Sequence, residues 1–421
     1  TLAFGEIAMN IIINPSSLAP IVRGFVLSLA DYSCMVQSVE AAFFHAGEPV
    51  FHSAHSAELS LIIDGLASGA NMDDGLVASL LKKALEPFVA RIREGLAKGK
   101  IDLSISNAKG ESIAQYQLVP LAPLDSRIRL AVHRPGDPSL LYSSARSEVV
   151  KGKISFVTGG AQGFGAEIAR GLALSGAIVW IADINLPGAE RFAQELSEEI
   201  GNQRVFPVEI DVSKEESVQK AFEIVAQTCG GLDLVVSNAG ILKAGSVLEQ
   251  PAKEFRLVNE INYIGFFNVA QQAARLLRLQ WLGAPDWYSD IIQINSKSGL
   301  EGSNKNAAYA GSKFGGIGLV QSFALELIEY RIKVNAICPG NFFEGPLWSD
   351  PQKGLFVQYL NSGKVPGAKT IEDVRAYYEA KIPMRRGCYG QDVLRAIYYL
   401  VEQLYETGQA LPVTGGQVML N

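Results

Sequence analysis

The chain has 421 residues, of which 48% are hydrophobic and 19% are charged, and its formal net charge at pH 7 is −6. This composition excludes an intrinsically disordered protein and permits a large buried core. A weakly acidic chain is a poor candidate for holding a phosphate backbone, so nucleic acid is not an expected partner. No stretch of about 20 residues is apolar enough for a membrane helix, and no export signal opens the sequence. We therefore expect a cytoplasmic protein without membrane contact.

The cysteines and histidines give no sign of a disulfide scaffold or a metal site. Four cysteines are scattered along the chain without a C-x-x-C pair: Cys34, Cys229, Cys338 and Cys388. Such spacing favours buried free thiols in a reducing cytosol. Three of the four histidines lie close together in sequence: His45, His52 and His55. No cysteine or acidic residue stands at a familiar ligand spacing from them, so we expect exposed loop histidines and no metal.

The first part of the chain predicts two long helices. One should begin at Ser16 or Ser17, whose side chains can cap it, and reach about Phe44. Its apolar surface would suit an oligomer interface, a partner surface or a core helix equally well. A second helical pattern runs from Asp74 to about Ala97 and contains Pro87, which should bend or split the helix.

A hairpin and a linker follow these helices. Alternation from Ile101 to Ile105, followed by turn residues 107–110, predicts a β-hairpin that returns through Val119. Prolines and serines then crowd the segment from Pro120 to Val150, which is typical of a linker. We therefore expect residues 1–146 to form a small accessory α+β domain of unknown role, and residues 147–421 to form a second domain.

The second domain alternates short apolar runs with amphipathic stretches. Strands are expected in residues 154–157, 177–182, 204–210, 232–237, 291–295 and 333–337. Most of these runs are continuously apolar, as parallel strands buried on both faces should be. Helical stretches, such as residues 166–174 and 188–200, lie between them. This alternation predicts an α/β fold with a doubly wound parallel sheet.

A glycine-rich sequence follows the first of these strands. Gly159, Gly163 and Gly165 have the spacing G-x-x-x-G-x-G and lead directly into a helix. Gly159 permits a tight turn, Gly163 lets the backbone approach a pyrophosphate, and Gly165 lets the helix pack close to the sheet. The free N–H groups at the helix start would then face the phosphates. On this motif alone, an ordinary glycine-rich turn remains the alternative.

Asp183 ends the second strand, 18 residues after Gly165. A carboxylate at about this distance accepts hydrogen bonds from an adenosine ribose and repels a 2′-phosphate. It therefore favours NAD over NADP. The alternative is a helix cap, because Ile184 and Asn185 follow.

A tyrosine and a lysine four residues apart, Tyr309 and Lys313, should project from one face of a helix. The lysine ammonium should lower the pKa of the tyrosine from its ordinary value of about 10, so that the phenol becomes a usable base. Ser296, at the end of the preceding strand, could hold a substrate oxygen while Tyr309 exchanges the proton. A Tyr-x-x-x-Lys pair alone usually lies on a solvated helix face. Because the glycine-rich sequence, Asp183 and Ser296 occur in the same chain, the pair here predicts a catalytic site.

Together these motifs resemble the short-chain dehydrogenase/reductase family, over residues from about 150 to 421. The resemblance implies that Tyr309 is the general acid/base and that Ser296 binds the reacting oxygen. It implies that Lys313 also grips the nicotinamide ribose, and that Asn262 kinks its helix and holds a water. The implied NAD-binding residues are Gly159, Gln162, Gly163, Phe164, Gly165, Asp183, Asp211, Val212, Asn238, Ala239, Gly240, Tyr309, Lys313, Pro339 and Gly340. Glu344 stands where many members place a Thr or Ser that touches the carboxamide.

The runs around Ser296, Lys313 and Pro339 are most similar to family members that oxidise sugar-alcohol phosphates at C2. This implies conversion of sorbitol 6-phosphate to fructose 6-phosphate, with NAD taking the hydride. Cations near the catalytic serine and after Gly340, where the family has a mobile substrate lid, could clamp the phosphate. The expected substrate contacts are Ser296, Lys297, Asn341, Arg385 and Arg386, with Lys364, Lys369 and Lys381 as further lid cations. The alternatives are a dehydrogenase of an unphosphorylated polyol or other sugar derivative, and an NAD-sensing regulatory binding protein.

The helix expected from Tyr309 to Glu329 is apolar on more than one face. Its apolar residues cannot all point into one monomer core: Ile317, Leu319, Val320, Phe323, Leu325 and Leu327. Family members pair through the two long helices beside the active site. The resemblance therefore implies a homo-oligomer, either a dimer or a tetramer.

Overall fold

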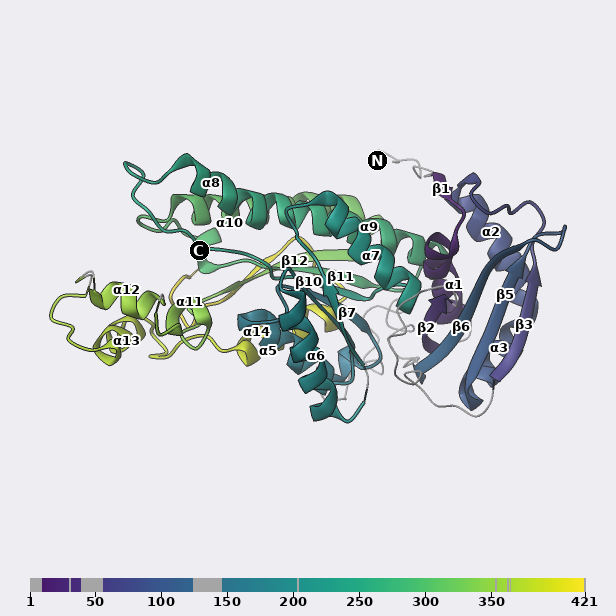
Figure 1. The fold of residues 1–421 in the computed structure, drawn as a ribbon, viewed down its shortest axis with the longest axis horizontal. Helices are drawn as coiled ribbons and strands as arrows, with labels where there is room; N and C mark the ends of the chain where they lie inside the picture. Colours follow the sequence, from purple (N-terminus) through teal and green to yellow (C-terminus); the bar gives the residue numbers. More distant parts are fainter. Residues whose placement is uncertain are drawn as a thin grey trace.

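The computed structural model describes residues 10–29, 32–38, 56–123, 146–202, 204–352, 354–361, 363 and 365–419. The molecule has three parts in a row along its longest axis (Figure 1). They are a group of short helices, a central sheet flanked by long helices, and an amino-terminal region built on a second sheet. Within these ranges, no helix is both long and apolar enough to cross a membrane.

Seven parallel strands form the central sheet, in the order β13-β12-β11-β10-β7-β8-β9. Their bounds are β7 Ile154–Thr158, β8 Ile178–Asp183, β9 Val205–Glu209, β10 Leu234–Ser237, β11 Ser289–Ile294, β12 Ile332–Pro339 and β13 Ala410–Val413. Every residue of β7, β8, β10, β11 and β12 is buried, which explains the continuous apolar runs in the sequence. The predicted doubly wound α/β fold is confirmed.

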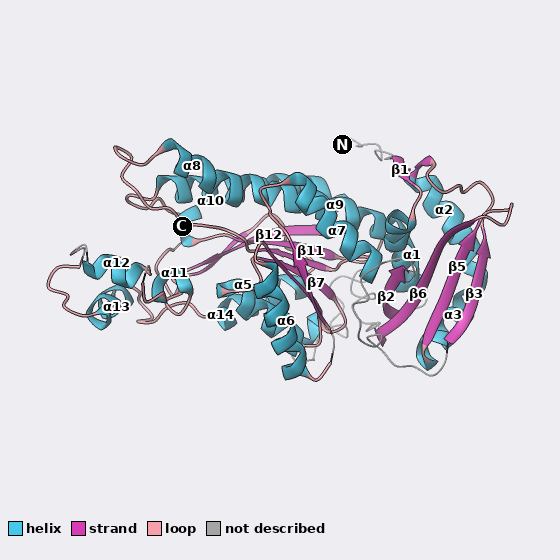
Figure 2. Cartoon of the chain, viewed as in Figure 1, coloured by secondary structure: helices cyan, strands magenta, loops and turns pink. Residues whose placement is uncertain are grey.

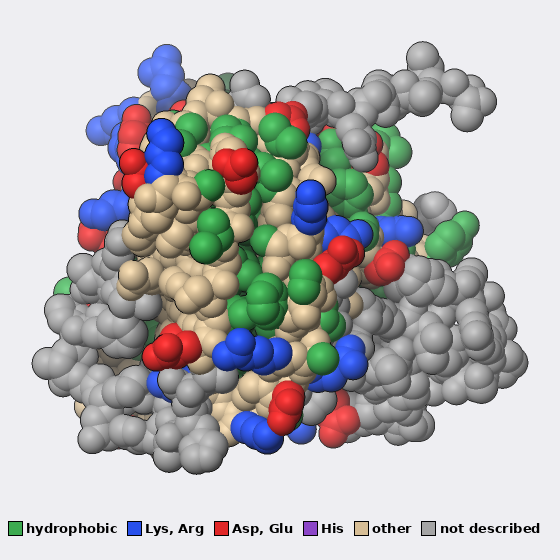
Figure 3. Space-filling view, turned by 90° about the vertical axis from the view of Figure 1, so that its right-hand side faces the viewer, with side chains coloured by type: hydrophobic (Ala, Val, Ile, Leu, Met, Phe, Trp, Pro, Cys, Tyr) green, Lys and Arg blue, Asp and Glu red, His purple; other side chains and the backbone are tan. Residues whose placement is uncertain are grey.

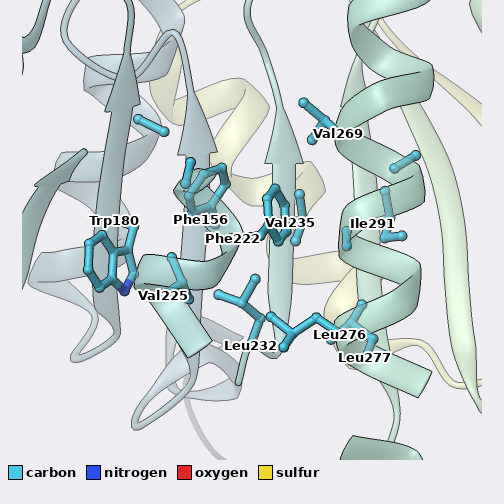
Figure 4. Close-up of a cluster of buried hydrophobic side chains, with 14 of the residues drawn as sticks. Phe156, Trp180, Phe222, Val225, Leu232, Val235, Val269, Leu276, Leu277 and Ile291 are labelled. Atoms are coloured by element: carbon cyan, nitrogen blue, oxygen red, sulfur yellow. The ribbon is translucent and has the colours of Figure 1, made fainter. Parts of the chain in front are cut away.

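Helices cover both faces of this sheet (Figure 2). One layer contains α7 Glu215–Cys229, α8 Ala252–Asn259, the π-helical turn Glu260–Ile264, α9 Gly265–Gly283 and α10 Ala307–Leu327. The other layer contains α5 Gly163–Leu174, α6 Leu186–Ile200 and α14 Gly390–Glu402. Figure 4 shows how α7 and α9 bury apolar side chains against the strands, with Phe222 of α7 over Phe156 of β7. Burial of both sheet faces leaves the strand ends as the place where ligands can approach.

The amino-terminal region contains a four-stranded sheet in the order β2-β6-β5-β3 and a two-stranded ladder of β1 and β4. Its strands are β1 Asn10–Ile12, β2 Tyr32–Ser38, β3 Ser56–Ile62, β4 Asn71–Asp73, β5 Lys100–Ser106 and β6 Ser112–Pro123. Its helices are α1 Pro15–Leu29, α2 Asp74–Leu85 and α3 Val89–Lys98. The expected hairpin is β5 paired antiparallel with β6, and the second expected helix is indeed split at Pro87 by the 3₁₀ turn Glu86–Phe88.

The prediction of one helix from Ser16 to about Phe44 was wrong. The helix ends at Leu29, and Tyr32–Ser38 forms strand β2 against β6. The antiparallel pairing with β6, far along the chain, overrides the local helical pattern, because it gives the backbone of this segment hydrogen-bond partners on one side. Residues 39–44 and the three histidines His45, His52 and His55 lie outside the described residues. In the part that is described, no group of three His, Cys, Asp or Glu side chains is placed to hold a metal ion.

The linker also starts later than expected. Strand β6 continues through Pro120 to Pro123, and Pro120 lies opposite Cys34 at an irregularity in the ladder, where a residue without an N–H is tolerated. Residues 124–145 lie outside the described residues, so the domain boundary at residue 146 stays a prediction.

The amino-terminal region packs directly on the dehydrogenase-like part through crossed helices. Helix α1 contacts α9 at two glycines, Gly24 and Gly283. A Cβ on Gly24 would lie 2.1 Å from the carbonyl oxygen of Gln280, and a Cβ on Gly283 would lie 2.5 Å from the carbonyl oxygen of Ile21. The two helices can therefore approach this closely only because both residues are glycine. Met35 of β2 and Val119 of β6 belong to the same apolar cluster as the sheet and α7. The two parts therefore share a continuous core.

Buried charges cross the same interface. Arg23 of α1 donates two hydrogen bonds to the carboxylate of Asp233, at 2.8 and 3.2 Å, and its Nε donates to the carbonyl oxygen of Cys34 at 3.0 Å. Arg23 and Asp233 are both fully buried. Arg278 of α9 pairs with Asp74 of α2. These pairs hold the amino-terminal region at the end of the sheet where β10 begins.

The outer end of the amino-terminal region has a mixed surface. In Figure 3, basic and acidic side chains alternate with apolar and polar ones over the described residues of this face. No broad basic area of the kind that binds a nucleic-acid backbone covers the part that the structure describes on this face.

Candidate active site

All the motif residues come together at the carboxyl ends of the parallel strands. The glycine loop follows β7, Asp183 ends β8, Asn238 follows β10, and Ser296 follows β11. In an open α/β sheet this edge is where ligands bind. The amino-terminal region lies at the opposite end of the same sheet (Figure 1). It therefore contributes no described residue to this site in its own chain.

The glycine loop has the shape that a dinucleotide pyrophosphate requires. Gly159 and Gly163 have φ angles of +61° and +60°, in the left-handed region that favours glycine. A Cβ on Gly165 would lie 2.0 Å from the carbonyl oxygen of Gly159, so no larger residue fits there. The residue before α5, Gln162, makes no side-chain cap, which leaves the first N–H groups of the helix for a ligand. The residues present fit a nicotinamide dinucleotide.

Asp183 is held rigidly beside this loop. Its carboxylate accepts hydrogen bonds from the backbone N–H of Ala161 at 3.1 Å and from that of Asn185 at 3.0 Å. The cap of helix α6 is Asn185, which accepts from the N–H of Gly188, so the alternative that Asp183 serves as the cap is wrong. The loop therefore fixes a carboxylate next to the glycine turn.

The floor of the site is built by side chains that join neighbouring strand ends. The Thr158 Oγ1 accepts hydrogen bonds from the N–H groups of Asn238 and Ala239, both at 3.0 Å. The Asn238 amide donates back to the carbonyl oxygens of Thr158 and Gly159. Val212, after Asp211, is buried against α9, and its carbonyl oxygen accepts from Asn268.

Tyr309 and Lys313 lie on the first turns of α10, with the Lys313 Nζ 5.6 Å from the centre of the Tyr309 ring. The Nζ donates to the carbonyl oxygen of Ile294 at 2.9 Å. Burial raises the pKa of Tyr309, and a hydrogen bond from Ser296 lowers it by a smaller amount. Burial also lowers the pKa of Lys313 to about 8. The net direction is thus opposite to the lowering expected from Lys313, because burial disfavours the charged phenolate.

Asn262 connects the catalytic helix to the cofactor turn. It lies in the π-helical turn Glu260–Ile264, a distortion often found at functional sites. Its Oδ1 accepts from the N–H of Ile241 at 2.8 Å, and its Nδ2 donates to the carbonyl oxygen of Ile241 and to Ser312 Oγ. The Ser312 hydroxyl in turn donates to the carbonyl oxygen of Tyr309.

Sequence reasoning missed two residues of this network, Asn295 and Ser312. Asn295 accepts from the N–H of Ser296 and donates to the carbonyl oxygen of Lys313, so it ties the serine to the catalytic helix. Both are buried polar residues inside the motifs already singled out. Because each of them is the residue directly before a predicted catalytic residue, Ser296 or Lys313, the sequence could have suggested that they position the site.

Comparisons with known proteins agree with this geometry. Residues 153–348 match the family model described as short chain dehydrogenase. The sorbitol-6-phosphate 2-dehydrogenase of Escherichia coli is 37% identical over 269 residues, which cover 63% of this chain and 99% of that protein. The chain belongs to the short-chain dehydrogenase family.

Other short-chain dehydrogenases match the same part of the chain. The crystal structure of sorbitol-6-phosphate 2-dehydrogenase SrlD from Erwinia amylovora aligns with a TM-score of 0.58 and 36% identity, covering 63% of this chain and all of that one. The 3-oxoacyl-[acyl-carrier-protein] reductase FabG of Aquifex aeolicus is 30% identical, covering 63% of this chain and 98% of that protein. As a short-chain dehydrogenase, the protein is an oxidoreductase that acts on CH–OH groups with a nicotinamide cofactor.

The residues expected to bind the substrate of this short-chain dehydrogenase lie around the lid, the segment from Phe342 to Gly387. It carries α11 Pro346–Ser349, α12 Leu355–Asn361 and α13 Ile371–Ala380. The Asn341 carbonyl oxygen accepts from the N–H of Cys388, so Asn341 forms the base of the lid. Arg385 donates to the carbonyl oxygen of Ala380, and Arg386 makes two hydrogen bonds to Asp392. Arg385 is thus bonded within the lid, and Arg386 ties the lid to α14.

Two of the expected substrate-binding cations, Lys297 and Lys381, act on each other through their charges. Lys297 follows Ser296, and Lys381 follows α13 with its Nζ 4.2 Å from the centre of the Tyr377 ring. Burial lowers the pKa of Lys297; nearby Glu301 opposes this, and the charge of Lys381 adds to it. Neither lysine ammonium has a hydrogen-bonded acid among the described residues, whereas Glu344 is paired with Arg375 of α13. Lys364 lies outside the described residues.

Proposed function

We propose that this dehydrogenase uses NAD to oxidise sorbitol 6-phosphate to fructose 6-phosphate. The two relatives named for this reaction are similar to the chain over nearly their whole length. The observation that carries the proposal in this chain is a pair of lysines: Lys297, which follows the catalytic serine, and Lys381, whose charge acts on Lys297. Two cations that repel each other and have no hydrogen-bonded acid among the described residues suit a phosphate dianion.

The chemistry follows from the positions of the side chains. Oxidation of a secondary alcohol removes a proton from its oxygen and a hydride from its carbon. The Ser296 hydroxyl holds the alcohol oxygen, and the deprotonated Tyr309 takes its proton. The Lys313 ammonium, 5.6 Å from the centre of the Tyr309 ring, stabilises the phenolate that takes this proton, and the phenol is neutral once the proton has been transferred. NAD, when bound, supplies the acceptor for the hydride.

The phosphate site gives the first prediction. Lys297→Met and Lys381→Met should each lower kcat/KM for sorbitol 6-phosphate by roughly ten- to a hundredfold, the value of a charge-assisted hydrogen bond. Both should leave the weak activity on unphosphorylated sorbitol almost unchanged. NADH formation followed by absorbance measures both. Lys220→Met, which removes an exposed lysine from α7, is the matched control.

The same assay decides the remaining alternatives. For Arg385 and Arg386 a phosphate role stays a proposal: selective loss of activity on the phosphorylated substrate in Arg385→Ala or Arg386→Ala would support it. Equal loss on both substrates would assign these arginines to the structure of the lid.

Equal kcat/KM of the wild type for both substrates would favour a dehydrogenase of unphosphorylated polyols. NADH binding without any turnover would favour a sensing protein.

We also propose that the cofactor is NAD and not NADP, because the carboxylate of Asp183 would face the 2′-phosphate. Asp183→Asn removes the charge but keeps an acceptor for the N–H of Ala161. It should shift the ratio of kcat/KM for NAD over NADP toward NADP by about tenfold or more, equivalent to about 1.4 kcal/mol. Asp183→Ala should shift it similarly but weaken NAD binding further, since the loop loses its anchor. Comparable kcat/KM of the wild type for both cofactors would contradict the proposal.

We propose further that the protein is a homo-oligomer, a dimer or a tetramer. Large apolar side chains remain exposed on α8, α9 and α10, namely Phe255, Leu257, Phe267, Phe314 and Leu325. A second copy covering this face would remove them from water. Light scattering at micromolar concentration should give two or four times the chain mass of 45.3 kDa. A particle of a single chain would refute the pairing.

The four free thiols support a cytoplasmic location. All four cysteines are buried, and burial raises the pKa of each to about 12. Such thiols are inert and suit a reducing compartment.

A further inference from the structure

The lid is a small structural unit with a core of its own. This core is separate from those of the sheet and comprises Phe343, Trp348, Leu355, Phe356, Val365, Val374 and Ile382. Trp348 lies at its centre, with ring centroids of Phe343, Phe356 and Tyr378 within 4.9 to 5.1 Å. At its base the lid is attached by the hydrogen bond between Cys388 and Asn341, by one from the N–H of Met384 to the carbonyl oxygen of Gly415, and by the pair of Arg386 with Asp392 of α14. The lid is therefore a packed unit of its own, joined to the sheet through its base.

The beginning of the lid lies against the glycine loop. Phe342 stacks on Phe164, with ring centroids 4.3 Å apart and an interplanar angle of 16°. Phe164 stands between Gly163 and Gly165, the residues that shape the pyrophosphate cradle. Pro346 of the lid also lies close to the glycine loop. A Cβ on Gly163 would be 3.9 Å from the Cδ of Pro346. Within the described residues, this stack is the aromatic contact that joins the cofactor loop to the lid.

The backbone around Phe342 is adapted to this contact. A Cβ on Gly345 would lie 2.6 Å from the ring of Phe342, so the absence of a side chain at Gly345 lets the ring lie flat. The next residue, Phe343, points the other way, into the lid core, where it is fully buried. Consecutive aromatic residues therefore join the cofactor loop on one side and the lid core on the other.

We propose that Phe164 and Phe342 are positioning residues that couple the lid to the cofactor loop, so that release of the dinucleotide requires the stack to separate. The lid then holds the cofactor in place while it covers the substrate. This coupling is independent of which alcohol is oxidised and goes beyond the proposed function. The coupling depends on residues of this chain alone. The stacked rings connect the pyrophosphate-binding loop to a lid that has a core of its own.

The test compares Phe164→Leu, Phe342→Leu and the double variant. Leucine retains apolar volume, so the fold is kept while the stack is lost. Each single variant should raise the dissociation rate of NADH, measured by stopped-flow fluorescence, by about two- to tenfold, the value of a stacked aromatic pair. The double variant should dissociate no faster than the faster single one, because the interaction is shared. Phe342→Tyr, which keeps the stack, should restore the wild-type rate.

A second readout uses the cofactor-free protein. Hydrogen exchange of lid amides in residues 343–382 should accelerate in Phe342→Leu and return to the wild-type rate in Phe342→Tyr. Phe206→Leu is the matched control: it removes a stack on Trp180, 5.1 Å between ring centroids, at the sheet edge and not in the lid. It should change neither NADH dissociation nor lid exchange. Unchanged NADH dissociation, strictly additive effects of the two substitutions, or unchanged lid exchange would each overturn the proposal.

Discussion

Replacing Tyr309 by phenylalanine should lower turnover by about a hundred- to ten-thousandfold, the usual contribution of a general acid/base, and leave cofactor binding intact. Only the hydroxyl is lost. The ring keeps its half-buried position, and Lys313 keeps its hydrogen bond to the carbonyl oxygen of Ile294. NADH formation measures the turnover, and NADH fluorescence titration measures the binding. Turnover within tenfold of the wild type would remove Tyr309 from this role.

Lys313→Met provides the contrast, because it should weaken cofactor binding as well as slow turnover.

The ionisation of Tyr309 can be followed separately by the ultraviolet difference titration of the wild type against Tyr309→Phe. In the cofactor-free protein, burial raises the pKa of Tyr309, so its phenol should lose its proton only above its ordinary value of about 10. The same titration with NAD bound measures how far the cofactor lowers this pKa. Ionisation near pH 7 without cofactor would contradict the effect of burial.

Arg23→Met should lower the free energy of unfolding by about 3–5 kcal/mol, the cost of breaking a buried ion pair. It leaves the fully buried Asp233 without its main partner, and the carbonyl oxygen of Cys34 loses a donor as well. Urea unfolding at pH 7, followed by fluorescence, measures the loss. Since Arg23 belongs to the amino-terminal region and Asp233 to the dehydrogenase sheet, a loss of this size would show that the two parts unfold together.

Two further variants make this result specific. Arg23→Met with Asp233→Asn should recover part of the stability, because the unpaired charge is gone while the one carboxamide oxygen still accepts from either Trp287 or Ile154. Lys98→Met, which breaks an exposed pair with Glu94, should leave the unfolding midpoint nearly unchanged. If the double variant were no more stable than Arg23→Met, the loss would come from packing and not from the buried charge.

The dependence on pH follows from the pKa of Asp233. Burial alone would raise it, but Arg23, Lys153 and the N–H of Ile154 outweigh burial and hold it below its usual value. A carboxylate with a depressed pKa contributes stability above its ordinary pKa of about 3.9, and that contribution is lost as the pH falls through the folded value. The difference in stability between the wild type and Arg23→Met should therefore shrink as the pH falls below about 3.9.

Much of the dehydrogenase part was determined by the sequence alone, because its signals are local. Continuous apolar runs predicted buried parallel strands, and the spacing of Gly159, Gly163 and Gly165 predicted the cradle that the φ angles now display. Tyr309 and Lys313 share a helix face simply because four residues make about one turn. The break at Pro87 likewise follows from a single residue.

Only the tertiary structure decided features that depend on contacts between distant segments. Tyr32–Ser38 became a strand because β6 was available to pair with it, against its local helical pattern. Arg23 found Asp233 210 residues away, and Phe342 found Phe164, without any mark in the local sequence. Arg386, which the sequence predicts at a phosphate, also meets Asp392 of α14. A charge or an aromatic ring can serve several partners equally well, and the partner it meets is set by which elements the fold brings together.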